Sequence, residues 1–152
     1  MGFSGARVIA LDVGEKRIGM AVSDPLGITA QGLETLERRN RSDDLARLVA
    51  LARQYEIRAW LVGLPLHLSG NEGRQAEKIR EFAARLQKVT QLPVEFQDER
   101  LTTVEATRVL RQAALSRAKN RRAVDRLAAV VLLQSYLDRQ RPPSTHDLDG
   151  GG

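Results

Sequence analysis

The chain has 152 residues, of which 42% are hydrophobic, a size and composition typical of one globular domain that can bury its own core. The absence of cysteine excludes disulfides, thiolate metal sites and a cysteine nucleophile, and it fits a reducing compartment, so a cytoplasmic location is expected. No apolar run is long enough to span a bilayer, and a formal net charge of +5, from 24 Lys and Arg against 19 Asp and Glu, favours a polyanion such as nucleic acid as partner.

The first part of the chain predicts an antiparallel meander of three strands. Residues 1–6 are expected to be a flexible lead-in. The run Arg7–Val13 is rich in branched apolar residues, as is typical of a central strand that is buried on both faces. Gly14 begins a turn, residues 18–23 form the second strand, and residues 27–36 are the candidate third.

After the meander the apolar residues change from strand to helix spacing. Ser42, followed by Asp43 and Asp44, predicts a helix N-terminus with a capping hydroxyl and two acids that face the helix dipole. Apolar residues at i, i+3, i+4 and i+7 then predict an amphipathic helix. A short strand over residues 58–63 and a second amphipathic helix over about 76–86 follow, and Trp60 and Phe82 are expected in the core.

The last part of the chain predicts one more strand, two helices and a tail. A strand over residues 93–97 ends at an acidic pair, and a capping box predicts a helix over about 103–113. A loop over residues 115–122, which we expect to be mobile, leads to a last helix over about 121–138. Residues 141–152 are expected to form a disordered tail.

These elements predict an α/β fold of the ribonuclease H-like kind. Three strands precede an alternation of helix and strand, and such an alternation favours parallel pairing through right-handed crossovers. The expected result is a five-stranded mixed sheet, a three-strand antiparallel meander plus parallel strands, with helices on both faces. Residues 7–140 would form this single domain.

Three acidic stretches that lie far apart in the sequence are expected to meet on this fold. Asp12 lies on the central strand, the pair Asp98 and Glu99 ends a strand that can lie beside it, and Asp125 lies in the first turns of the last helix. The residues three and four positions after Asp125 are alanines, so this helix can approach the sheet closely. Converging carboxylates repel one another, and Mg²⁺ or Mn²⁺ would relieve that repulsion and supply phosphodiester chemistry. These four acids are therefore candidate catalytic residues.

Each acid also has a structural explanation when it is taken alone. Asp12 could belong to a turn, Asp98 could pair with Arg100, and Asp125 could pair with Arg122. The spacing of Gly14 and Gly19 allows a turn that offers backbone amides to a phosphate, and a plain hairpin turn explains it equally well. Basic residues near the acids are candidate contacts to a nucleic-acid backbone: Lys16, Arg17, Arg100, Arg117, Lys119, Arg121 and Arg122.

Four stretches, ALDVGEKRIGMAVSD, LVGLPLHLSGNEG, QDERLTTVEA and VDRLAAVVLLQSYLD, resemble the YqgF/RuvX family in order and spacing. The resemblance covers about residues 7–138. It implies a cytoplasmic, metal-dependent nuclease that matures the 5′ end of 16S rRNA, and resolvase-like activity on branched DNA is also proposed for the family. Mapped by motif, it implies that Asp12, Glu99 and Asp125 hold Mg²⁺ or Mn²⁺, with Asp98 as the alternative to Glu99.

Two other classes of function share parts of this pattern. ATPases and sugar kinases of the actin-like superfamily also open with Asp-x-Gly and a glycine turn, but they enclose a nucleotide between two lobes and this chain has one. A nucleic-acid-binding module without catalysis would keep the fold. The sequence leaves open whether the substrate is structured RNA or branched DNA, and whether the protein is a monomer or a homodimer.

Overall fold

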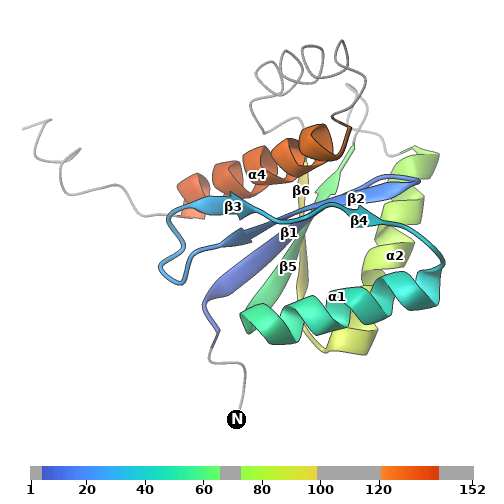
Figure 1. Ribbon diagram of the computed structural model, residues 1–152, viewed down its shortest axis with the longest axis horizontal. Helices are drawn as coiled ribbons and strands as arrows, with labels where there is room; N and C mark the ends of the chain where they lie inside the picture. The colour runs from blue at the N-terminus through green and yellow to red at the C-terminus, as the bar shows by residue number, and fades with distance from the viewer. Residues whose placement is uncertain (1–4, 66–72, 99–120, 141–152) are drawn as a thin grey trace, which may run out of the picture.

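The computed structural model describes residues 5–65, 73–98 and 121–140, and over residues 121–124 it describes the helix without the side chains. Three predicted segments lie outside these ranges: the helix over 103–113, the part of the 115–122 loop that precedes the last helix, and the C-terminal tail. The elements in chain order (Figure 1) are β1 (Arg7–Val13), β2 (Arg17–Ser23), β3 (Ala30–Gly32), β4 (Leu36–Glu37), α1 (Arg41–Tyr55), β5 (Ile57–Leu64), α2 (Arg74–Thr90), β6 (Val94–Asp98) and α4 (Arg121–Gln140). Within these ranges no helix has the length and apolar character needed to cross a membrane.

The elements form one mixed sheet with helices on both faces, as the sequence predicts. The strand order is β3-β2-β1-β5-β6, and β4 also pairs with β2. The β1–β2 and β2–β3 pairs are antiparallel, while β1–β5 and β5–β6 are parallel. In Figure 1, α4 covers one face of the sheet, and α1 and α2 cover the other.

The predicted third strand was wrong in one respect, because it is two short strands and the sheet has six strands rather than five. β3 pairs with residues 21–23 of β2, and β4 pairs with Arg17 and Ile18. Between these two ladders, residues 33–35 lie opposite only residues 19 and 20. One extra residue on one strand interrupts the ladder, as in a β-bulge.

The predicted N-cap of the first helix was also wrong. The cap is Asn40, whose side-chain Oδ1 accepts a hydrogen bond of 2.9 Å from the backbone N–H of Asp43. Asparagine caps a helix as well as serine does, and here it starts α1 at Arg41. Asp43 and Asp44 both lie in the first turn of α1, as predicted. Asp44 is also buried, and its carboxylate accepts hydrogen bonds from Arg38 and Arg47.

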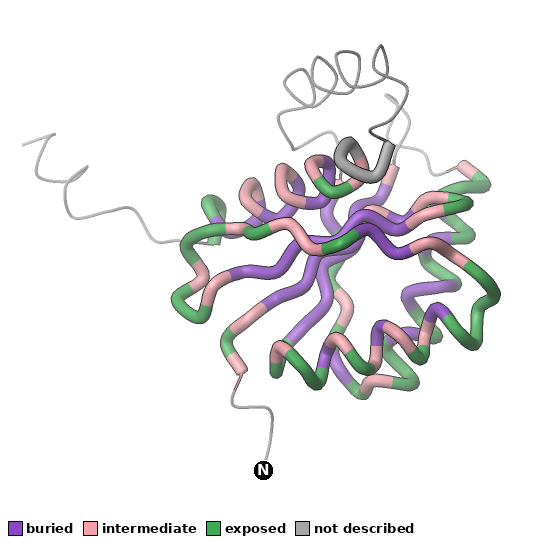
Figure 2. The backbone as a smooth tube through the Cα atoms, in the orientation of Figure 1, coloured by how far each residue is buried: buried purple, intermediate pink, exposed green. Residues whose placement is uncertain are grey.

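The strands of the sheet are buried along most of their length (Figure 2), and the two faces of the sheet bury different sets of side chains. Because side chains alternate along a strand, Ile9 and Leu11 of β1 pack toward α1 and α2, while Val8 and Ala10 pack toward α4. The core under α1 and α2 is the larger one, and it includes Trp60 and Phe82, which are 0% and 4% exposed. The prediction that these two aromatic residues are core residues is thereby confirmed.

Candidate active site

Asp12 lies on the α4 side of the central strand. It continues the alternation of Val8 and Ala10, whose side chains belong to the core under α4, and it is half-buried near the carboxyl end of β1. Its partner across the antiparallel ladder is Gly19 of β2. Directly opposite residues of such a ladder have their Cα atoms about 4.5–5.5 Å apart, so whatever packs on Gly19 lies close to Asp12.

The segment that packs on Gly19 is the N-terminal part of α4. A Cβ atom on Gly19 would lie only 2.0 Å from the backbone carbonyl oxygen of Asp125. A Cβ atom on Gly32 would lie 2.5 Å from Cγ of Arg126. The absence of side chains at these two sheet positions therefore lets the helix backbone approach the strands, and it brings Asp125 to the neighbourhood of Asp12 although the two residues are far apart in sequence.

The carboxylate of Asp125 is held by an arginine from the sheet. Arg17 donates a hydrogen bond from Nε to Oδ2 of Asp125 at 2.9 Å. Their side chains are 24% and 27% exposed, respectively, so solvent reaches the ion pair. Arg17 stands two residues before Gly19 on the same face of β2. The pairing with Arg122 that the sequence suggested concerns a side chain outside the described ones, and it stays a prediction. The expected contact between Arg17 and a phosphate stays a prediction.

Three further contacts fix α4 over the sheet. Gln97 of β6 donates from Nε2 to the carbonyl oxygen of Leu132 at 3.0 Å, and this bond is buried. The hydroxyl of Tyr136 donates to Oε2 of Glu95 at 2.8 Å, and burial, followed by this hydrogen bond, raises the pKa of Tyr136. At the other edge of the sheet, the N–H of Ala30 donates to Gln134 at 3.0 Å. The helix that carries Asp125 is thus held at both edges.

Of the acidic pair Asp98 and Glu99, only Asp98 belongs to the described residues. Asp98 is the last residue of β6 and pairs with Leu64 of β5, which belongs to the core under α1 and α2. Gln97 contacts α4, and since neighbouring residues of a strand alternate in direction, the register of Asp98 is on the α2 side, opposite to that of Asp12. Glu99 lies outside the described residues.

The described part of the site supplies two acids and not a complete metal cage. No group of three or more His, Asp or Glu residues that could hold a metal ion occurs among residues 5–65, 73–98 and 125–140. Asp12 and Asp125 offer carboxylate oxygens, the donor type that Mg²⁺ and Mn²⁺ take, so the donors present fit such an ion. Of the other predicted site residues, Lys16 is exposed in the turn after β1, and Arg121 and Arg122 are in the first turn of α4. The remaining predictions, Arg100, Arg117 and Lys119, lie outside the described ranges.

The two glycines singled out in the sequence have structural tasks. The N–H of Gly14 donates to the carbonyl oxygen of Arg17 at 2.9 Å, so this amide closes a hairpin turn and is not available to a phosphate. Gly19 is a strand residue beneath α4. From the sequence we did not predict that α4 packs directly on Gly19 and Gly32. Their signal was a glycine inside a strand pattern, which often marks close backbone approach.

Comparisons with known proteins cover the same part of the chain. A family model described as "RuvX: Holliday junction resolvase" matches residues 6–139. A relative from Koribacter versatilis named "Putative pre-16S rRNA nuclease" is 58% identical over 134 residues, which are 88% of this chain and 88% of the relative. One of the same name from Moorella thermoacetica is 55% identical over 133 residues, covering 88% and 95% of the two chains. The solved structure "T. thermophilus RuvC in complex with Holliday junction substrate" matches with a TM-score of 0.58 at 15% identity, over 88% of this chain and 94% of that one. This likeness confirms the predicted fold class.

Proposed function

The chain belongs to the RuvX family, described as Holliday junction resolvases, and from this premise we propose that it is a nuclease that hydrolyses phosphodiester bonds with Mg²⁺ or Mn²⁺. Its substrate would be structured RNA, and its task the processing of the 5′ end of pre-16S rRNA in the cytoplasm. The names of the relatives from Koribacter versatilis and Moorella thermoacetica support this substrate. The description of the family model supports a second candidate, cleavage of branched DNA.

One observation carries the proposal, namely the approach of Asp125 to the strand pair that bears Asp12. Gly19 is the ladder partner of Asp12 and lies in contact with the backbone of Asp125. Two carboxylates brought together near the carboxyl end of a central strand repel each other unless a cation lies near them. Arg17 balances the charge of Asp125 in part, and solvent reaches both side chains of this pair.

In the proposed site Asp12 and Asp125 would hold the metal ion, and one acid of the pair after β6 would complete the set. We take Glu99 as that acid, as the family resemblance implies, because Asp98 has the α2-side register. A bound divalent ion would lower the pKa of an attacking water and neutralise charge on the phosphate. Arg17 would keep the carboxylate of Asp125 oriented, and the contacts of Gln97 and Tyr136 would keep α4 in register with the sheet.

The test is cleavage by the purified protein of a pre-16S rRNA 5′ leader and of a four-way DNA junction, assayed side by side with Mg²⁺, Mn²⁺ or EDTA. We expect metal-dependent cleavage that falls about hundredfold or more in Asp12→Asn and in Asp125→Asn, since each removes a charged metal ligand. The preferred substrate decides between rRNA processing and junction cleavage. Glu99→Gln should lower the rate more than Asp98→Asn does.

The matched control is Asp138→Asn, the same chemical change at an exposed position in the last turn of α4. This variant should cleave at the wild-type rate. If neither substrate is cleaved with either metal ion, or if Asp12→Asn cleaves as fast as the wild type, the catalytic proposal is wrong. A nucleic-acid-binding module without catalysis would then be the better description.

A further inference from the structure

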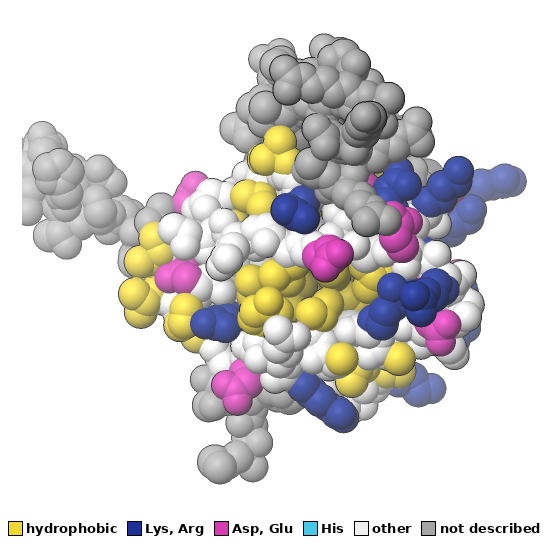
Figure 3. Space-filling model, viewed as in Figure 1, with side chains coloured by type: hydrophobic (Ala, Val, Ile, Leu, Met, Phe, Trp, Pro, Cys, Tyr) yellow, Lys and Arg dark blue, Asp and Glu magenta, His cyan; other side chains and the backbone are white. Residues whose placement is uncertain are grey.

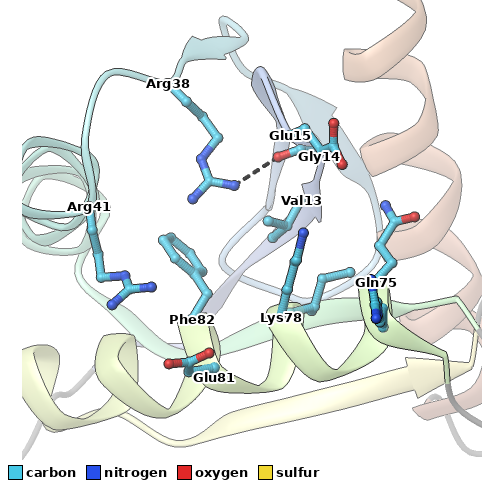
Figure 4. A pocket seen from close by; sticks show the side chains of 11 residues that line it. Val13, Gly14, Glu15, Arg38, Arg41, Gln75, Lys78, Glu81 and Phe82 are labelled. Atoms are coloured by element: carbon cyan, nitrogen blue, oxygen red, sulfur yellow. Dashed lines mark hydrogen bonds between the residues drawn. The ribbon is translucent and has the colours of Figure 1, made fainter.

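A second hollow lies on the opposite side of the sheet from α4, at the carboxyl end of β1. We call it the α1–α2 cavity, because the first turns of both helices border it together with the turn after β1 (Figure 4). Its volume is about 520 Å³, and its floor is formed by the buried side chains of Val13, Ile79 and Phe82. Four cationic side chains form its rim, namely Arg38, Arg41, Arg74 and Lys78, and two carboxylates, Glu15 and Glu81, also line it.

Arg38 builds the wall of this cavity and is held in place from three sides. Its Nη1 donates to the carbonyl oxygen of Gly14 at 2.8 Å, and its Nε donates to the buried carboxylate of Asp44 at 3.2 Å. Its guanidinium carbon also lies 5.1 Å from the centre of the Phe82 ring. The turn after β1, α1 and α2 are thereby tied together, so the cavity is preformed by contacts that do not involve a ligand.

The other three cations of the rim have no acidic partner in the described part of the chain. The ion pairs found there use Arg17, Arg38 and Arg47, and none reaches Arg41, Arg74 or Lys78. Arg41 and Arg74 are the first residues of α1 and α2, and Lys78 follows in the second turn of α2. Positive charge at a helix N-terminus is unfavourable, whereas an anion placed there is stabilised by the helix dipole. Three cations beside two helix N-termini therefore favour the binding of an anion, although Glu15 and Glu81 also line the cavity.

The basic rim continues from the cavity toward the candidate active site. A shallower hollow shares Glu15, Arg38, Arg41 and Lys78 with the cavity and extends to Arg17, which holds Asp125. Together the two hollows present seven cationic side chains and four carboxylates. Figure 3 shows Lys and Arg side chains gathered on the side of the molecule where α1 begins. An anion long enough to reach both places would follow this surface around the turn after β1.

We propose that the α1–α2 cavity binds a backbone phosphate of the nucleic-acid substrate at a point away from the bond that is cleaved. The assignment rests on the proposed function in that it takes the substrate to be nucleic acid. Continuity of the basic surface with Arg17 favours a polymer over a small anion, because a polymer can occupy the cavity and the candidate active site at once. The apolar floor is a wall of low dielectric constant, which concentrates the field of the rim cations inside the cavity.

The test is equilibrium binding by the full chain carrying Asp12→Asn, with EDTA present so that the nucleic acid stays intact. The probes are a fluorescent pre-16S rRNA 5′ leader and a four-way DNA junction, titrated at several salt concentrations. The variant Arg41→Gln/Lys78→Gln should weaken binding about tenfold at low salt. It should also lower the slope of log K against log salt by roughly 0.7–0.9, because that is the contribution of one lost phosphate contact.

The matched control is Arg85→Gln/Lys88→Gln, which removes the same charge from exposed positions further along α2 that line neither hollow. It should leave affinity and salt slope close to those of the parent. An equal loss in both variants would mean that net charge alone is responsible, and it would overturn the cavity assignment. Affinity unchanged in Arg41→Gln/Lys78→Gln would overturn it as well, with the proposed nuclease function intact.

Two further measurements distinguish a failure of the proposed function from a cavity that binds a small phosphorylated molecule. If the parent protein binds neither nucleic acid, the proposed function fails together with this inference. If adenosine monophosphate or inorganic phosphate binds the parent, and only that binding is lost in Arg41→Gln/Lys78→Gln, the cavity is a site for a small phosphorylated molecule and the nucleic-acid assignment is wrong. Circular dichroism melting of both variants checks that they fold, since the four side chains are exposed and make no ion pair in the described part of the chain.

Discussion

The two faces of the sheet carry out different tasks with different side chains. Under α1 and α2 the sheet presents large apolar residues such as Leu11, Trp60 and Val62, which build a thick core. Under α4 it presents Ala10, Ala21 and the glycine position 19, so the helix backbone almost touches the strands. The core under α1 and α2 (the thick side) mainly stabilises the fold. The close contact under α4 (the thin side) brings the carboxylate of Asp125 to the central strand. The same alternation along β1 serves both tasks.

The largest expected effect comes from the thick side. Trp60→Ala removes a side chain that is 0% exposed and that donates from Nε1 to Thr90 at 3.1 Å. Loss of so large a buried group leaves a cavity, and we expect the free energy of unfolding to fall by about 3–5 kcal/mol. Urea denaturation measures this loss. If the two faces are separate in function, cleavage per folded molecule should remain close to wild type below the unfolding transition.

On the α4 side of the sheet, we expect Gly19→Ala to lower stability less than Trp60→Ala does and to lower activity more. Gly19→Ala puts a Cβ atom 2.0 Å from the carbonyl oxygen of Asp125, so α4 must shift away from the sheet. Overpacking of this kind costs about 1–3 kcal/mol. The shift moves Asp125 relative to Asp12, so we expect cleavage to fall by about tenfold or more in molecules that remain folded.

Trp60→Ala and Gly19→Ala serve as controls for each other in parallel denaturation and cleavage assays. The comparison of the two faces fails if Trp60→Ala, at a temperature where it is folded, loses as much activity per molecule as Gly19→Ala. It also fails if Gly19→Ala retains full activity, because α4 would then not need its present distance from the strands.

The smallest effect concerns the turn between β2 and β3, which lies beside α4. The carboxylate of Asp24 accepts hydrogen bonds from the N–H groups of Thr29, Ile28 and Leu26, and these bonds, that of Thr29 first, lower the pKa of Asp24. A lowered folded-state pKa contributes stability above the unfolded pKa of about 3.9, and this contribution is lost as the pH falls through the folded value. The turn should therefore loosen in acid.

Thermal melts of the wild type and of Asp24→Asn from about pH 7 to about pH 2 test this expectation. The wild type should melt slightly higher near neutral pH, and the difference should shrink as the pH falls below about 4. Gln134 of α4 donates to the carbonyl oxygen of Ile28, so the variant should also loosen this end of α4 slightly. A difference in melting temperature that is independent of pH would contradict the role given to the carboxylate.

Much of the fold could be predicted because the local pattern and the tertiary structure agree. The apolar run of β1 and the helical spacing of α2 depend on neighbouring residues, and both elements occur where the pattern predicts them. The last helix was predicted over 121–138 and is found at Arg121–Gln140. The errors arose where two local solutions were nearly equal, as with the N-cap, where Asn40 was chosen over Ser42, and with the bulge that divides the third strand.

The fold class, the family and the list of candidate acids could be read from the amino-acid sequence, because strand alternation, helix period and ordered motifs are properties of the chain. Which of these groups lie together depends on the tertiary structure. The pairing of Arg17 with Asp125, the contact of Gly19 with α4 and the α2-side register of Asp98 all depend on strand register and on the distance between helix and sheet. The α1–α2 cavity joins residues from the first turn, α1 and α2. No local sequence pattern predicts such contacts, because they depend on the packing of residues that are tens of positions apart in the sequence.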